Sequence, residues 1–200
     1  ARDTIDLRMA YGEFGGARNM VRAGRQELVF GEQRLIGHLN WVNGARSFDG
    51  VRVTIARKPF KFDAFATSVV TLQPDAFDKS GNGNRLAGAY ATSTKLLPKA
   101  TVEPYVFWRR DVNLRSELGA LGTLSQTTIG TRVAGQLPAR LDYGVEMALQ
   151  RGGLEQDSLN AWAGHWQVRA SLPGWAAPKV TSEYNFATGD DVANDGKRQT

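Results

Sequence analysis

Several features are missing from this sequence, and each absence removes a class of protein. There is no cysteine, so disulfides, thiolate catalysis and cysteine-based metal sites are excluded. No stretch approaches the roughly 20 consecutive apolar residues that a membrane-spanning helix needs. A helical membrane protein is therefore excluded. A membrane protein built from strands is not excluded, because strands that alternate apolar and polar residues have a polar average hydropathy.

Catalytic and metal-binding patterns are missing as well. The chain has no Gly-x-Ser-x-Gly motif and no nucleophile and base at a useful spacing. Its two histidines, His38 and His165, are far apart and isolated, which disfavours a metal centre. The run Gly81-Asn82-Gly83-Asn84 lacks the pattern of a phosphate-binding loop. We therefore expect neither an enzyme, nor a cofactor, nor a metal site.

The charge balance is modestly basic, with 25 Lys and Arg against 20 Asp and Glu and a formal net charge of +5. This excess favours an anionic partner. The basic residues are interleaved with acidic ones instead of forming a patch, which argues against nucleic acid.

What the sequence does contain is period-two alternation along nearly its whole length. The composition fits, with 22 glycines, 10% aromatic residues and a mean hydropathy of −0.36, a mixture natural for many short strands. In residues 141–150, Leu141, Tyr143, Val145, Met147 and Leu149 share one face, as in a strand with one apolar side. The pattern predicts an all-β chain with about ten strands, at 4–11, 20–30, 50–57, 62–72, 86–95, 100–109, 126–136, 140–150, 158–170 and 178–188.

The links between these segments alternate between short and long. Short links are expected at 12–19, 58–61, 96–99, 137–139 and 171–177, and longer polar ones at 31–49, 73–85, 110–125, 151–157 and after 188. This is typical of an antiparallel up-and-down transmembrane β-barrel with tight periplasmic turns and larger external loops. Aromatic residues near strand ends, among them Phe14, Phe30, Phe107 and Trp108, suggest two interfacial girdles.

The last residues run through a polar, charged segment to Thr200, whereas bacterial barrels end on a membrane strand. We therefore expect residues 1–200 to be one partial outer-membrane barrel domain, with N-terminal and C-terminal parts of the barrel outside the chain.

Two stretches resemble the alginate-export family of bacterial outer-membrane porins. In residues 24–53 the matching positions are Gly24, Arg25, Gln26, Gly31, Arg34, Leu35, Trp41, Arg46, Phe48, Asp49 and Gly50. In residues 188–198 they are Thr188, Gly189, Asp190, Asp191, Asp195, Gly196 and Lys197. The resemblance implies a monomeric barrel of roughly eighteen strands in the outer membrane of a Gram-negative cell. It also implies the export of an anionic, alginate-like polysaccharide through a pore lined by arginines.

The faces opposite the apolar stripes should line the lumen of such a barrel. As pore-lining, substrate-binding residues we predict Arg25, Glu27, Arg34, Arg46, Arg52, Arg109, Arg132, Glu146 and Arg169. Arginines in a confined channel attract carboxylates through Coulomb forces and bidentate hydrogen bonds. For each residue a second role stays open, in which interior Arg–Glu pairs only brace the barrel wall. Asp49 is expected to be structural, satisfying loop amides or pairing with Arg46.

The leading hypothesis is a passive channel for an anionic polysaccharide or its oligomers, in contact with outer-membrane lipid. One alternative is a general porin for anions and small solutes. Another, from a different class, is a soluble β-barrel that binds carbohydrate. A continuous apolar band on the outside of the sheet distinguishes the membrane protein from the soluble one.

Overall fold

A computed structural model describes residues 7–39, 45–73, 76–117, 119–190, 192 and 195–198. The strands are β1 (Ala10–Gly16), β2 (Asn19–Gln26), β3 (Phe48–Arg57), β4 (Phe60–Thr71), β5 (Lys79–Ser93), β6 (Ala100–Arg115), β7 (Leu121–Leu137), β8 (Leu141–Leu154), β9 (Asp157–Ser171), β10 (Lys179–Ala187) and β11 (Lys197–Arg198). Within these residues, no helix is long and apolar enough to cross a membrane.

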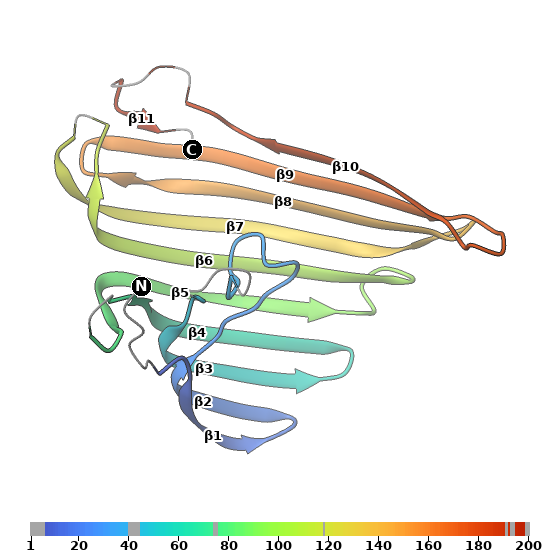
Figure 1. The fold of residues 1–200 in the computed structure, drawn as a ribbon, viewed down its shortest axis with the longest axis horizontal. Helices are drawn as coiled ribbons and strands as arrows, with labels where there is room; N and C mark the ends of the chain where they lie inside the picture. The colour runs from blue at the N-terminus through green and yellow to red at the C-terminus, as the bar shows by residue number, and fades with distance from the viewer. Residues whose placement is uncertain are drawn as a thin grey trace.

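Strands β1 to β10 form one antiparallel sheet in chain order, each paired with the next (Figure 1). The short β11 pairs in parallel with β9. The order runs from β1 to β10 without joining those two strands among the described residues, so this sheet is open. The predicted all-β, antiparallel, up-and-down architecture is confirmed.

Several strands are longer than the alternation predicted. β6 has 16 residues and β7 has 17, more than the roughly 9–11 that cross a bilayer. The expected long links at 110–125 and 151–157 are therefore wrong, because the chain leaves the sheet only at 116–120 and 155–156. Strand ends that project into water can carry polar side chains and still keep their backbone pairing, so polarity alone suggested loops there.

The first hairpin also lies elsewhere than predicted. The expected strand at 4–11 falls partly on residues 1–6, outside the described residues, and β1 occupies most of the expected link at 12–19. Gly15 has a φ of 109°, and a Cβ at this position would lie 2.2 Å from the carbonyl oxygen of Asn19. A glycine is required for this close approach, so Gly15 allows the tight hairpin between β1 and β2.

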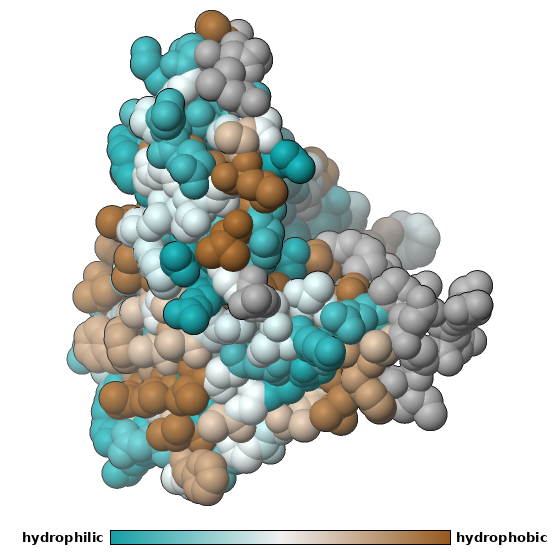
Figure 2. Space-filling view, turned by 90° about the vertical axis from the view of Figure 1, so that its left-hand side faces the viewer, coloured by the Kyte–Doolittle hydropathy of each residue, from teal (hydrophilic) through white to brown (hydrophobic). Residues whose placement is uncertain are grey.

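One face of the sheet, here called the outer face, carries an unbroken apolar row. Directly paired positions from β1 to β9 form this row, and they are Phe14, Val21, Val53, Ala64, Ala89, Val106, Ile129, Leu149 and Trp162. Ile129 and Leu149 are 58% and 51% exposed. In the view from the end that carries the longer loops, hydrophobic atoms gather along one margin of the molecule (Figure 2). An apolar surface of this extent marks contact with lipid or protein.

The opposite face, here called the inner face, is partly covered by the link between β2 and β3. Residues 27–39 of this link, here called the 27–47 loop, cross in front of the sheet (Figure 1), and they place Leu28, Phe30 and Ile36 in a buried cluster. The sheet contributes Phe48, Phe65, Tyr90, Tyr105 and Phe107 to that cluster. Phe30 and Phe107 are therefore core residues, and the expectation that they belong to an interfacial girdle is wrong.

Candidate functional site

A network of charged side chains lies on the inner face beside this aromatic cluster, centred on Arg132 of β7. Arg132 is paired in register with Glu103 of β6 and Glu146 of β8, which places all three side chains on one face. Its Nη1 donates to Glu103 Oε2 at 2.5 Å, and its Nη2 donates to Glu32 Oε1 at 2.6 Å. Glu32 belongs to the 27–47 loop, so Arg132 ties the loop to the sheet.

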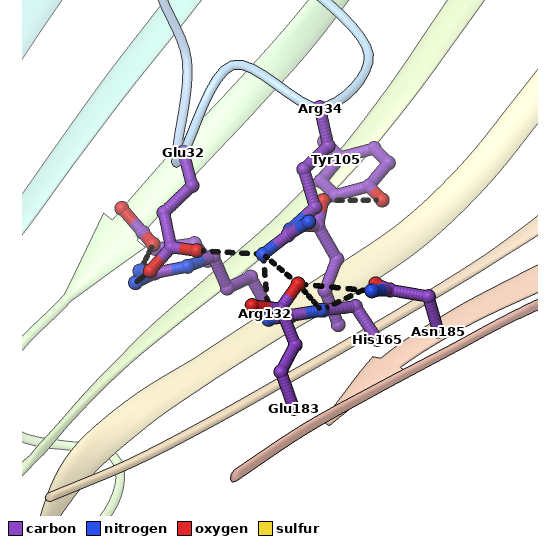
Figure 3. A network of polar contacts seen from close by, with 9 residues as sticks. Glu32, Arg34, Tyr105, Arg132, His165, Glu183 and Asn185 are labelled. Carbon is purple, nitrogen blue, oxygen red and sulfur yellow. Dashed lines mark hydrogen bonds and ion pairs between the residues drawn. The ribbon is translucent and has the colours of Figure 1, made fainter. Parts of the chain in front are cut away.

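Arg34 provides a second tie from the same loop (Figure 3). Its Nη2 donates to Glu32 Oε2 at 3.1 Å and lies 2.6 Å from Nε2 of His165 on β9. Its guanidinium also lies 3.8 Å from Glu146 and 3.9 Å from Glu183. A single loop arginine therefore contacts side chains from β8, β9 and β10.

The sheet residues around Arg34 are oriented by one another. Nδ1 of His165 lies 2.7 Å from Oδ1 of Asn185, whose Nδ2 donates to Glu183 at 2.9 Å. Tyr105 donates to Glu146 Oε1 at 3.0 Å. Burial raises the pKa of Glu32, but the hydrogen bonds and charges of Arg132 and then Arg34 outweigh burial and hold it below its ordinary value of 4.5.

Two cavities open between the 27–47 loop and the inner face. One, of about 280 Å³, is lined by Arg34, Leu35, Tyr105, Glu146, Ala148, Ala163, Gly164, His165, Asn185, Phe186 and Ala187. The other, of about 150 Å³, is lined by Leu35, Ile36, Arg46, Phe48, Val69, Asn84, Leu86 and Arg109. Both contain arginine beside apolar surface, a combination that accepts the carboxylate and the ring of a sugar acid.

The predicted site residues do not all lie together. Arg34, Arg132 and Glu146 meet in the network, and Arg46 and Arg109 line the second cavity. Arg52 is held 2.8 Å from Asp63 on the inner face, with its guanidinium 5.2 Å from the centre of the Phe30 ring. Arg169 lies nearer the opposite end of the sheet, where its Nε donates to Thr181 at 3.4 Å.

Arg25 and Glu27 are not on the inner face with the others. Arg25 is paired in register with Asp49, whose side chain shares the face of Val51 and Val53. The Arg25 guanidinium lies 2.8 Å from Asp49, and Glu27 pairs with Arg8. Asp49 therefore has the expected structural role, but with Arg25 and the Ser80 hydroxyl as partners and not with Arg46.

Sequence reasoning did not single out Glu32, Tyr105 or Asn185 for the site. Glu32 lies in a loop, where no periodicity assigns a face to a side chain. Tyr105 and Asn185 lie on strands, but they are uncharged, and the prediction selected charged residues. A count of the polar residues that share the inner register of β6 and β10 would have found these two.

The open antiparallel sheet, apolar on one face and charged on the other, has the architecture of part of a β-barrel wall. A family model described as alginate export matches residues 1–200. The chain therefore belongs to the alginate-export family, a family of outer-membrane transport proteins and not of enzymes. Trp41 and Asp191 of the motifs that first suggested this family lie outside the described residues. Searches of curated proteins and of solved structures each found no match.

Proposed function

We propose that this chain forms part of the wall of a monomeric outer-membrane channel. Through this channel an anionic, alginate-like polysaccharide or its oligomers would pass by diffusion. Membership of the alginate-export family supports the polysaccharide. The apolar outer row from Phe14 to Trp162 supports the position in lipid, since exposed side chains of this kind favour hydrocarbon over water.

The observation that carries the proposal is the pairing of accessible arginines with a cavity on the inner face. Arg46 is exposed, and 43% of the Arg109 side chain is accessible, although Asp111 holds one of its nitrogens at 2.9 Å. Both arginines line the same cavity. They are the residues we propose to contact the carboxylates of the polymer.

Other inner-face arginines have a different role in this proposal. The side chains of Arg52 and Arg132 are only 14% and 16% exposed, and each is held by at least one carboxylate. We infer that they brace the wall and the loop. The carboxylates that surround them also limit how strongly a polyanion binds, and weak binding at several points is what a conducting channel requires.

The test is conductance of the full-length protein in planar bilayers, with uronate oligomers titrated against neutral oligomers of equal length. Selective block by uronates is expected, and Arg46→Gln combined with Arg109→Gln should weaken it about thirtyfold, since each of the two lost charge-assisted hydrogen bonds costs roughly 1 kcal/mol in an open site. Arg25→Gln is the matched control, because it removes an arginine from the outer face.

The outcomes separate the alternatives. Block that ignores the charge of the sugar would support a general porin and contradict the proposal. A protein that stays soluble without detergent and gives no current would contradict the membrane channel itself. Equal loss of block in the Arg25→Gln control would show that the cavity arginines have no special role.

A further inference from the structure

On the outer face, a row of polar residues lies between the apolar row and the ends of the strands that carry the longer links. Directly paired positions from β2 to β7 form this row, and they are Arg25, Asp49, Ser68, Arg85, Arg110 and Ser125. The row lies toward the end of the sheet that carries the longer links, such as the 27–47 loop. Long links are external in outer-membrane barrels, so in the proposed channel this row faces the outer leaflet.

Two members of the row, Arg85 and Arg110, are directly opposed like charges. They are register partners on β5 and β6, so their side chains start on the same face, where facing like charges are destabilising. Asp49 is held by Arg25 and Ser80, and Ser68 stands between it and Arg85. Within the described residues, no carboxylate forms an ion pair with either arginine. An anion from outside the chain would relieve their repulsion.

The depth of this pair corresponds to the headgroup level of the bilayer. Arg110 follows Val106 of the apolar row by four positions, which is about 13 Å along a strand and about 10 Å along the membrane normal at the usual tilt. The hydrocarbon band is about 25 Å tall, so with the apolar row placed at its middle the guanidinium groups reach its edge. Trp108, between the two positions, donates its indole N–H to Ser125 Oγ at 3.3 Å, as expected of an interfacial tryptophan.

A groove on the outer face adjoins the pair. It has a volume of about 340 Å³, and its lining is Asp49, Ala66, Thr67, Ser68, Arg85, Leu86, Ala87 and Trp108. The small side chains of Ala66 and Ala87 form an apolar trough beside the exposed Trp108 ring. Arg85 closes the trough on the side toward the loops. An acyl chain in the trough therefore brings its phosphorylated head to the arginines.

We propose that Arg85 and Arg110 bind a phosphate group of the phosphorylated glycolipid in the outer leaflet, with an acyl chain of the same molecule in the adjoining groove. Two guanidinium groups suit a phosphate because each presents a planar pair of donors. This inference concerns the outside of the wall and not the passage of sugar, but it rests on the membrane orientation in the proposed function.

The experiment uses the full-length protein in detergent, with lipid binding followed by native mass spectrometry. Diphosphorylated lipid A, dephosphorylated lipid A and inorganic phosphate are the three probes. Binding of the diphosphorylated form should be stronger than that of the dephosphorylated form, and Arg85→Gln with Arg110→Gln should weaken it about tenfold. Lys95→Gln with Arg140→Gln is the matched control, because it removes two exposed cations at the tight-turn end.

Each other result overturns the proposal. Equal binding of both lipids would show that the phosphate is not recognised. Unchanged lipid binding by the double variant would show that the two arginines do not bind the lipid. Inorganic phosphate bound as tightly as the lipid would make this an anion site without a lipid. Conductance of the same preparations shows whether the variants fold, and it separates the two proposals, since a failed lipid site leaves uronate block intact.

Discussion

Nη2 of Arg34 lies 2.6 Å from Nε2 of His165, although 131 positions separate the two residues in the chain. A guanidinium has only donors, so this contact requires Nε2 to be the acceptor. The imidazole is then neutral with its proton on Nδ1, from which it donates to Asn185 Oδ1 at 2.7 Å. The Arg34 end of the 27–47 loop thus depends on a single tautomer of His165, in addition to the tie between Glu32 and Arg132.

Replacing His165 by leucine should release this end of the loop. Loss of a hydrogen bond to a charged group costs about 1.5–3 kcal/mol, which raises the population of the undocked loop tenfold or more. Limited proteolysis of the folded protein within residues 27–39 measures that population. His165→Gln, which keeps an acceptor, should behave nearly as the unchanged protein does. Similar cleavage of all three proteins would show that the contact does not hold the loop.

Acidification should undock the loop through Glu32. Arginine contacts lower its pKa in the folded protein below 4.5, so its ion pairs stabilise the docked loop above that pH, and the stabilisation is lost as pH falls through the lowered value. Conductance or proteolysis measured from pH 6 to pH 3 should therefore show a transition below pH 4.5. In Glu32→Gln this transition should be absent. A transition of unchanged size would assign it to another group.

The aromatic cluster should contribute more to loop docking than the ion pairs do. The Phe30 ring stacks on Phe65 and Tyr90, with centroids 5.3 and 4.9 Å apart. Phe30→Ala should cost about 3 kcal/mol of docking free energy, read by hydrogen exchange of residues 27–39. Val29→Ala is the control, because Val29 is 37% exposed. Equal exchange in both variants would contradict a docking role for Phe30.

The sequence was sufficient for the fold class and for the faces of most strands. In β8, for example, Leu141 to Leu149 alternate as predicted, and Met147 and Leu149 are exposed on the outer face while Ala148 is buried. The ends of the strands were harder to predict. Polar residues at the ends of β6 and β8 pair their backbone groups with the neighbouring strand, but their side chains are of the kinds common in loops.

The candidate site could be predicted only in part, because half of it comes from a loop. Arg132 and Glu146 followed from strand alternation, and they are register partners. The predicted pore-lining position of Arg25 at the end of β2 is wrong by one residue. Gln26, not Arg25, is the residue on the inner face, where it is buried and donates to Gly50. Which strand the loop reaches depends on packing of Leu28 and Phe30, which no local pattern records.

Two neighbouring positions of β8 provide the strictest test that the outer face meets lipid. Leu149 lies in the apolar outer row between Ile129 and Trp162, and Gln150 points to the other face. An arginine at the middle of a barrel's lipid face costs about 2–4 kcal/mol, so Leu149→Arg should lower the free energy of folding into phospholipid vesicles by that amount. Gln150→Arg should change it by less than about 1 kcal/mol, because a charge on the lumen side stays hydrated. Reversible urea unfolding in vesicles measures both, and equal effects would mean that the apolar row does not face the membrane.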